Sequence, residues 1–462
     1  MQKSIEKHLI NLKFINNLKA FKAYDIRGVW GSELNSELVY KIGFFLPSVI
    51  VSKKILVGRD VRNSSDEMHA ALCRGLVDAG IEVFDAGICT TPMVYWGSGK
   101  YDFDASLMIT ASHNPKEYNG IKVSAKNVEP IGYDNGLKNV EKLIELESPI
   151  VKQEGGSIKD FEINEAYQAY LESYISFTSD LKVSMDISNG MAGIFSEALF
   201  PDAIVINSKP DGNFPAHEPN PLELENQDQI KAEVLKNKSD IGVIFDGDAD
   251  RVMFIDETGK FVSPDLIIAV LGHYFLKTNK TEQVVQDIRT SKAVGEYLSK
   301  FGAELNIWKV GRAFGAAKLK EVDGIFGGEL AGHYYFRDFY YSDSGLLAAI
   351  LVLNIAEDFL KKGKKFSELI SDISCYSNTG EINFKIEDKL GAMNKVRDYF
   401  MDTEKPDRYL DFDGYRLDFE DWWFNIRPSN TEPYLRFLAE AKSDELLKQK
   451  TDIIYGILES FK

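Results

Sequence analysis

Thr110-Ala111-Ser112-His113-Asn114-Pro115 directly follows an apolar run at residues 105–109. The run predicts a buried strand, so Ser112 is expected in a loop at the strand's carboxyl end, where α/β proteins bind their ligands. A serine hydroxyl needs activation before it acts as a nucleophile, and here a histidine is its neighbour. Pro115 and Asn114 favour a turn of restricted conformation. Taken alone, the hexapeptide is equally compatible with an ordinary surface turn.

Strands and helices alternate on both sides of this loop. Residues 54–84 predict a strand, a helix and a second strand, and the helix should begin at a capping box, Ser64-Ser65-Asp66-Glu67, and end before Gly80. The polar stretch 152–159 indicates a linker. Other strands are expected at residues 120–124, 183–187, 241–245, near 284, at 303–307 and at 434–438, and other helices at 133–147, up to 199, from 264, from 291, at 343–359 and at the C-terminus. This alternation predicts an α/β protein with doubly wound parallel or mixed sheets.

The composition is that of a globular protein. The chain has 462 residues, of which 44% are hydrophobic, enough for roughly three or four domains. A net charge of -17 leaves no basic face for a phosphate backbone, so we expect no nucleic acid partner.

The 3 cysteines are odd in number and lack metal-ligand spacing, which is typical of a reducing compartment. No signal-peptide pattern is present, and the longest apolar segment, residues 345–356, is too short to cross a bilayer. We therefore expect a cytoplasmic protein with no membrane partner.

Three aspartates, Asp246, Asp248 and Asp250, alternate with small residues directly after the apolar run 241–245. An extended loop would point all three carboxylates the same way, and a hard divalent cation would relieve their repulsion. We expect Mg²⁺ there, with Arg251 facing the same anion as the metal. A solvated acidic turn and a calcium loop are the alternatives, although the glycine and distal glutamate of an EF-hand are not matched.

The stretch Arg427-Pro428-Ser429-Asn430-Thr431 gathers a guanidinium, two hydroxyls and an amide around a turn enforced by proline. Such donors suit a phosphate that is held without reacting. A loop that only reversed the chain would not need so many of them.

Five motifs follow one another along the chain: Tyr24-Asp25-Ile26-Arg27-Gly28, the Ser112 loop, Asp246-Gly247-Asp248-Ala249-Asp250-Arg251, Gly328-Glu329-Leu330-Ala331-Gly332-His333 and Arg427-Pro428-Ser429-Asn430-Thr431-Glu432-Pro433. Over nearly the whole chain, this set resembles the α-D-phosphohexomutase family, in its phosphomannomutase/phosphoglucomutase branch. The resemblance implies three related α/β domains with mixed sheets and a smaller α+β C-terminal domain around a central cleft. We place the phosphoserine loop in residues 1–155, the metal loop in 156–260, the sugar-binding loop in 261–375 and the phosphate-binding loop in 376–462.

The resemblance also implies roles for single residues. Ser112 would carry a phosphoryl group whose oxygen completes a magnesium site with Asp246, Asp248 and Asp250. Lys122, His113 and Arg27, together with Arg251, would handle the proton and the transferring phosphoryl. Lys122 is our preferred general base or acid, although outside this context it would be an exposed strand lysine. The implied substrate-binding residues are Tyr24, Arg312, Glu329, His333, Arg427, Ser429, Asn430 and Thr431. Of these, Glu329 and His333 would contact sugar hydroxyls, although on its own their loop could be a glycine turn with a solvated glutamate.

The implied reaction interconverts hexose 1-phosphate and hexose 6-phosphate through a hexose 1,6-bisphosphate, which also serves as activator. Mannose phosphate is the first expected substrate and glucose phosphate the second, because the Tyr24 motif is typical of that branch; glucosamine phosphate is third. Two departures from the common pattern bear on this preference: Ala331 replaces a serine, and Arg312 replaces a histidine. The partner would be a phosphosugar, and the protein a monomer or homodimer.

Two other classes of function share these residues. A phosphatase could use the same serine and metal, with water intercepting the phosphoenzyme. A scaffold could keep the fold and bind phosphosugars without turnover, although the intact serine, aspartates and phosphate loop argue against this.

Overall fold

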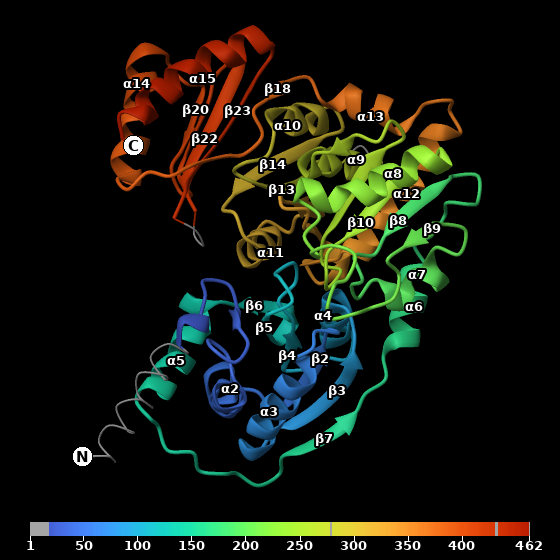
Figure 1. Cartoon of the computed structure of the whole chain (residues 1–462), viewed down its shortest axis with the longest axis vertical. Helices are drawn as coiled ribbons and strands as arrows, with labels where there is room; N and C mark the ends of the chain where they lie inside the picture. The colour runs from blue at the N-terminus through green and yellow to red at the C-terminus, as the bar shows by residue number, and fades with distance from the viewer. Residues whose placement is uncertain (1–17, 278–279, 430–432, 462) are drawn as a thin grey trace.

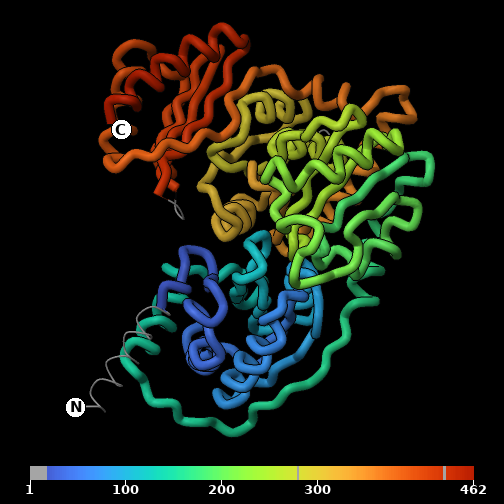
Figure 2. The backbone as a smooth tube through the Cα atoms, in the orientation of Figure 1, coloured from blue at the N-terminus to red at the C-terminus, as the bar shows by residue number. Residues whose placement is uncertain are grey.

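Four α/β units follow one another in the computed structural model, which describes residues 18–277, 280–429 and 433–461 (Figure 1). Each unit is built around its own sheet. The blue N-terminal unit lies below the green second and yellow third units, and the red C-terminal unit lies beside the third (Figure 2). The alternation of strands and helices predicted from the sequence is therefore confirmed.

The first unit has a 7-stranded mixed sheet in the order β1-β5-β4-β2-β3-β7, with β6 paired to β5. Its strands are β1 (Ile26–Val29), β2 (Lys54–Arg59), β3 (Glu82–Ile88), β4 (Ala105–Ile109), β5 (Tyr118–Ala125), β6 (Glu129–Ile131) and β7 (Ser157–Asp160). Its helices are α2 (Ser36–Ile50), α3 (Ser65–Asp78), α4 (Thr91–Lys100) and α5 (Lys138–Glu145). The strand expected before the serine loop is β4, and all five of its residues are buried.

Two local predictions in this unit are wrong. The stretch 152–159, predicted as a linker, contains most of β7, which pairs in parallel with β3. This strand is mostly exposed, so it lacks the apolar alternation by which a half-buried strand is recognised. The capping box at Ser64 does not form, because Ser64 adopts helical backbone angles and its hydroxyl accepts a hydrogen bond from Asn119 Nδ2 at 2.8 Å.

The second and third units have 5-stranded sheets in the orders β12-β11-β10-β8-β9 and β14-β13-β15-β16-β17. The second contains β8 (Val183–Asp186), β9 (Ile204–Ile206), β10 (Ile241–Phe245), β11 (Val252–Asp256), β12 (Phe261–Val262), α6 (Asn164–Glu172), α7 (Gly193–Leu199) and α8 (Asp228–Asn237). The third contains β13 (Glu282–Asp287), β14 (Ala303–Trp308), β15 (Phe326–Gly328), β16 (Tyr334–Phe336), β17 (Ser342–Asp343), α9 (Pro264–Phe275), α10 (Lys292–Ser299), α11 (Arg312–Glu321), α12 (Gly345–Leu360) and α13 (Phe366–Ile373).

The C-terminal unit is antiparallel throughout its described strand pairs. Its strands are β18 (Ser377–Asn378), β19 (Ile382–Phe384), β20 (Arg408–Leu410), β21 (Tyr415–Asp418), β22 (Trp422–Pro428) and β23 (Leu435–Ala441), and its helices are α14 (Lys389–Thr403) and α15 (Asp444–Glu459). Phe400 of α14 and Ile454 of α15 join the strands in one core. Trp422 and Trp423 are buried, so this pair packs and does not form an exposed stacking surface.

The first three sheets place the loops that carry the predicted site residues at equivalent positions. The serine, aspartate and glutamate loops follow β4, β10 and β15. Each of these strands is parallel to one neighbour and antiparallel to the next strand of the chain. All three loops therefore leave the sheet where its parallel part meets its antiparallel part, a place where α/β sheets bind ligands.

The longest apolar segment of the sequence forms helix α12. Its residues from Gly345 to Glu357 are all buried, and it contacts α9 of the third unit and β11 of the second. A helix that is apolar on every side is expected inside a protein core. Among the residues that the structure describes, no helix is long and apolar enough to cross a membrane.

Candidate active site

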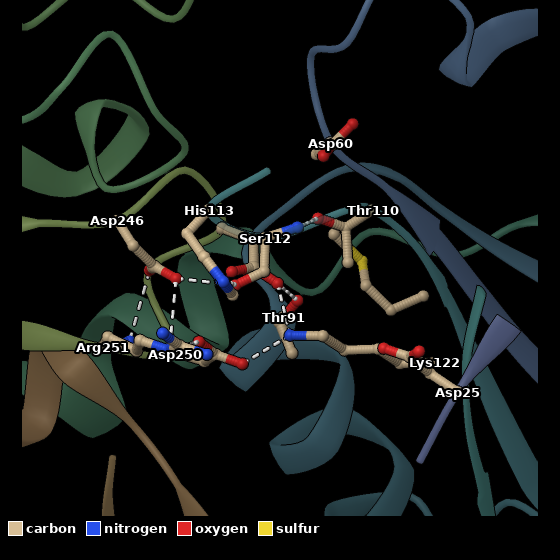
Figure 3. A network of polar contacts seen from close by, with 12 residues as sticks. Asp25, Asp60, Thr91, Thr110, Ser112, His113, Lys122, Asp246, Asp250 and Arg251 are labelled. Carbon is tan, nitrogen blue, oxygen red and sulfur yellow. Dashed lines mark hydrogen bonds and ion pairs between the residues drawn. The ribbon is translucent and has the colours of Figure 1, made fainter. Parts of the chain in front are cut away.

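Ser112 stands at the junction of the first two units (Figure 3). Its Oγ donates a hydrogen bond to Asp246 Oδ2 at 2.8 Å and lies 3.3 Å from His113 Nδ1. Its backbone has a φ of 51°, which is left-handed and costs a residue other than glycine about 1–2 kcal/mol. The Thr110 hydroxyl helps to hold it by accepting the Ser112 N–H at 2.9 Å. The hydroxyl thus faces the aspartate loop of another unit.

Asp246, Asp248 and Asp250 follow β10 and have side chains that are 0% exposed. Each offers an oxygen atom, and these atoms all lie within 4.8 Å of one another. Thr91, the first residue of α4, donates its hydroxyl to Asp248 Oδ2 at 2.5 Å and its N–H to the Asp248 carbonyl. These contacts fix the aspartate loop against the unit that carries Ser112.

Lys122 of β5 reaches the same carboxylates. Its Nζ donates to Asp248 Oδ2 at 2.7 Å and to Asp250 Oδ2 at 2.5 Å. Burial alone would lower the pKa of Lys122, but the charges of Asp248 and Asp250 outweigh it, so the pKa is raised. Burial, with the charges of Asp248 and Asp250, raises the pKa of Asp246 well above its ordinary value. The ammonium therefore neutralises part of an otherwise repulsive cluster.

The donor set suits a hard divalent cation. Asp248 Oδ1 and Asp250 Oδ1 are buried, and among the described residues they have no hydrogen-bond partner. Orphaned carboxylate oxygens inside a protein are costly, and an ion bound through oxygen would satisfy them. Together with Asp246, these residues form an acidic triad able to hold a metal ion.

A chain of polar contacts runs from the aspartates into the third unit. Arg251 Nε donates to His333 Nε2 at 2.9 Å, and His333 Nδ1 lies 2.6 Å from Asp343 Oδ2. Arg312 Nε donates to Asp343 Oδ1 at 2.9 Å, and its guanidinium lies 4.1 Å from the centre of the Tyr95 ring. Burial raises the pKa of Asp343, but Arg312 and His333 reverse this, so the pKa is lowered. Asp343 therefore stays ionised between two predicted substrate-binding residues.

Glu329 follows β15 and is buried beside His333. Its Oε2 accepts the Gly311 N–H at 3.3 Å and its Oε1 accepts the Tyr335 hydroxyl. Burial raises the pKa of Glu329, partly offset by the charge of His333. The glutamate loop is thus tied to the loop that precedes Arg312.

Arg27, His113 and Tyr24 lie around the serine loop. Arg27 donates to Asn114 Oδ1 at 2.7 Å and to Asp25 Oδ2 at 2.5 Å. Burial lowers the pKa of His113 well below its ordinary value, and the charge of Arg251 lowers it further. The Tyr24 hydroxyl donates to the Val310 carbonyl at 3.2 Å, which joins the first unit to the third.

The predicted phosphate loop begins inside β22. Arg427 Nε and Nη2 donate to Asp413 Oδ1 at 3.2 and 3.1 Å, and Asp413 Oδ2 accepts the Val310 N–H at 2.8 Å. Ser429 donates its N–H to the Tyr434 carbonyl at 2.9 Å. Asn430 and Thr431 lie outside the described residues. Among the described residues, no ion pair joins Arg427 to the Ser112 and aspartate cluster. Val310 contacts both Asp413, the partner of Arg427, and Tyr24 of the first unit.

Sequence reasoning missed Asp343, Asp413 and Thr91. All three hold residues that the motifs did predict, yet each lies outside those motifs. A lone aspartate or threonine gives no pattern by which its partner could be found, so only the folded chain identifies them.

Four domain families match the chain in order. They are described as phosphoglucomutase/phosphomannomutase alpha/beta/alpha domain I, domain II, domain III and C-terminal domain, and they match residues 18–149, 165–259, 263–376 and 381–455. A phosphomannomutase of Methanocaldococcus jannaschii is 37% identical over 96% of this chain and 98% of its own length. One of Escherichia coli is 35% identical over 96% of this chain and 100% of its own.

The fold has close counterparts among solved structures. A phosphoglucomutase/phosphomannomutase family protein of Burkholderia thailandensis superposes with a TM-score of 0.86 at 28% identity, over 96% of this chain and 97% of its own. The family matches cover all four units, and the relatives match over nearly their full length. The chain therefore belongs to the α-D-phosphohexomutase family, the family of phosphoglucomutases and phosphomannomutases.

Proposed function

We propose that this phosphohexomutase interconverts hexose 1-phosphate and hexose 6-phosphate through a phosphoryl group on Ser112 and a hexose 1,6-bisphosphate intermediate. One observation supports this more directly than any other. Ser112 Oγ of the first unit donates to Asp246 at 2.8 Å, in the carboxylate cluster of the second. A nucleophilic oxygen beside an acidic triad that can hold a cation suits phosphoryl transfer, which depends on positioning and on neutralising charge.

In the first half of the proposed reaction, a sugar hydroxyl oxygen forms a bond to phosphorus while the bond between phosphorus and Ser112 Oγ breaks. The hydroxyl loses its proton and Ser112 Oγ regains one. His113, whose Nδ1 lies 3.3 Å from Oγ, and Lys122 are the candidates for moving these protons. Mg²⁺, when bound to the three aspartates, would neutralise charge on the phosphoryl oxygens. Arg27 and Arg251 would add positive charge near the phosphoryl group.

In the second half, the other phosphate of the bisphosphate returns to Ser112. The sugar must therefore present each end in turn, and the non-reacting phosphate needs one common holder. Arg427, with Ser429, Asn430 and Thr431, is proposed as that holder. A guanidinium suits either phosphate because its planar donors bind the phosphate oxygens and do not contact the sugar.

Mannose phosphate is the proposed first substrate and glucose phosphate the second. The relatives from Methanocaldococcus jannaschii and Escherichia coli are named phosphomannomutases. Tyr24, Glu329, His333 and Arg312 would line the sugar site, where Ala331 brings no hydroxyl.

We further propose a cytoplasmic location, from the cysteine composition, and a monomer or homodimer, which light scattering can distinguish.

A comparison of three substrates tests this function. Mannose 1-phosphate, glucose 1-phosphate and glucosamine 1-phosphate are supplied at equal concentration with Mg²⁺ and a catalytic amount of the matching bisphosphate. We expect 6-phosphate to form fastest from the mannose compound and Ser112→Ala to remove nearly all turnover. Release of inorganic phosphate without isomerisation would instead indicate a phosphatase, and turnover by Ser112→Ala at near the normal rate would contradict the serine mechanism.

A further inference from the structure

Arg62, a residue outside all five motifs, makes most of the side-chain contacts to the backbone of the serine loop. It lies between β2 and α3 and is 2% exposed. Its Nη2 donates to the carbonyls of Ser112 and Asn114 at 2.9 and 2.6 Å, and its Nη1 to those of Pro115 and Tyr118 at 2.7 and 3.1 Å. One guanidinium thus binds four carbonyls of the loop.

The guanidinium is itself fixed from two sides. Asp60 Oδ2 lies 3.2 Å from Arg62 Nε, while Asp60 Oδ1 accepts the Arg62 N–H at 3.0 Å and the Ser65 hydroxyl at 2.6 Å. On the other side, the Phe214 ring of the second unit lies 5.0 Å from the guanidinium carbon. The position of Arg62 is therefore set jointly by the first and second units.

The contact between units continues on either side of Arg62. Asn63 Nδ2 donates to Asn213 Oδ1 at 2.9 Å, and a Cβ on Gly212 would lie 2.4 Å from the Val61 carbonyl oxygen. A Cβ on Gly247, between two of the aspartates, would lie 2.5 Å from the Ser112 carbonyl oxygen. The oxygen that Arg62 holds thus lies against the aspartate loop.

We propose that Arg62 is a positioning residue for phosphoryl transfer, which holds Ser112 in its left-handed conformation so that Oγ faces Asp246. The proposal rests on the function proposed above. Ser112 has an unfavourable backbone, and such residues persist only when their surroundings hold them. A lysine could not replace Arg62, because it offers three donors on one atom in place of a planar fork that reaches four carbonyls. A displacement of about 1 Å can cost a reaction about a hundredfold in rate.

The test compares Arg62→Lys with Arg59→Lys, a matched control. Arg59 ends β2, and among the described residues its side chain forms ion pairs with Asp66 at 2.7 Å and Asp85 at 3.7 Å. Intact mass gives the fraction of protein in which Ser112 accepts a phosphoryl group from hexose 1,6-bisphosphate. Each rate is divided by the concentration of that fraction. We expect Arg62→Lys to lower kcat about a hundredfold. KM for the phosphosugar should change less than about threefold, because the substitution leaves the proposed phosphate contacts of Arg427 in place. Arg59→Lys should leave both constants near those of the unaltered protein.

A second readout does not depend on catalysis. Hydrogen exchange of the backbone amides of residues 112–114 and 116–118 should become faster in Arg62→Lys and stay unchanged in Arg59→Lys. Phe214→Leu keeps Arg62 and removes the ring beside it, so it should show the same faster exchange to a smaller degree. It replaces Arg62→Lys as the test variant if Arg62→Lys does not fold. Unchanged exchange in both Arg62→Lys and Phe214→Leu, or an equal fall of kcat in the Arg59 variant, would overturn the proposal. Faster exchange in a protein whose unaltered form never phosphorylates Ser112 would refute the proposed function and the catalytic purpose of Arg62, while its role in holding the serine loop would stand.

Discussion

The aspartates of the candidate site are buried although they carry charge. Asp246, Asp248 and Asp250 are fully buried carboxylates, which normally need partners of opposite charge. Lys122 is bonded to Asp248 and Asp250, whereas Asp246 has a raised pKa and accepts the Ser112 hydroxyl. Asp248 Oδ1 and Asp250 Oδ1, which have no hydrogen-bond partner among the described residues, remain where a cation would bind. The buried charge is therefore arranged for a ligand and not for stability.

Asp248→Asn should remove the stabilisation of the protein by Mg²⁺. An ion that binds only the folded state stabilises it by about 2.7 kcal/mol at a hundred times its Kd, so MgCl₂ should raise the Tm of the unaltered protein. The variant replaces a ligand carboxylate by an amide, and its Tm should respond little. Differential scanning calorimetry with and without MgCl₂ measures this. The exposed Asp202→Asn serves as control and should respond normally; a full response in Asp248→Asn would contradict the metal assignment.

At the level of elements, burial helped prediction but did not decide it. β4 and β10 are buried along their whole length, and their continuous apolar runs identified them in the sequence. β11 and β15 are equally buried but were not predicted. The edge strand β7 is exposed and was mistaken for a linker. The contacts of Arg62, Asp343 and Asp413 could not be predicted, because they join residues far apart in the sequence through bonds that leave no periodic pattern.

Gly311→Ala should destabilise the protein more than Gly363→Ala. Both glycines have positive φ, 125° and 75°, so both substitutions strain the backbone. At Gly311 a Cβ would also lie 2.9 Å from Tyr24 Cζ, whereas at Gly363 no atom lies within 4 Å. Overpacking of this kind costs about 1–3 kcal/mol, and we expect a difference of that size in the free energy of unfolding from guanidinium titrations. Equal losses in the two variants would show that the Tyr24 contact is not rigid.

At the scale of the whole molecule, the third and fourth units are joined by buried polar contacts. Glu440 of β23 accepts the Ser291 hydroxyl at 2.6 Å and the Trp423 indole N–H at 2.7 Å. Arg416 of β21 donates to the carbonyls of Ile288 and Thr290 at 2.9 and 2.6 Å. Burial raises the pKa of Glu440 to about 7, helped by the charge of Asp265. A titrating carboxylate therefore lies between two units.

Glu440→Gln should remove part of the pH dependence of stability. The folded protein keeps a proton on Glu440 up to a pH of about 7, whereas in the unfolded chain the group ionises near its ordinary pKa of about 4.3. The unfolded state therefore binds fewer protons in this window, and stability falls as pH rises through it and then levels off. Unfolding titrations between pH 5 and pH 8 should show a smaller fall in the glutamine variant than in the unaltered protein. The exposed Glu197→Gln is the control; identical slopes in all three proteins would contradict this assignment.

Ser112 is proposed to lend and recover the phosphoryl group, and mapping the phosphorylated residue of the protein tests this role. The protein is incubated with hexose 1,6-bisphosphate carrying isotopic label in both phosphoryl groups, digested, and mapped by mass spectrometry. We predict label on Ser112 alone, its loss when unlabelled hexose 6-phosphate is added, and no label in Ser112→Ala. Label on another residue, or continued isomerisation with no label on Ser112, would rule out this role of Ser112.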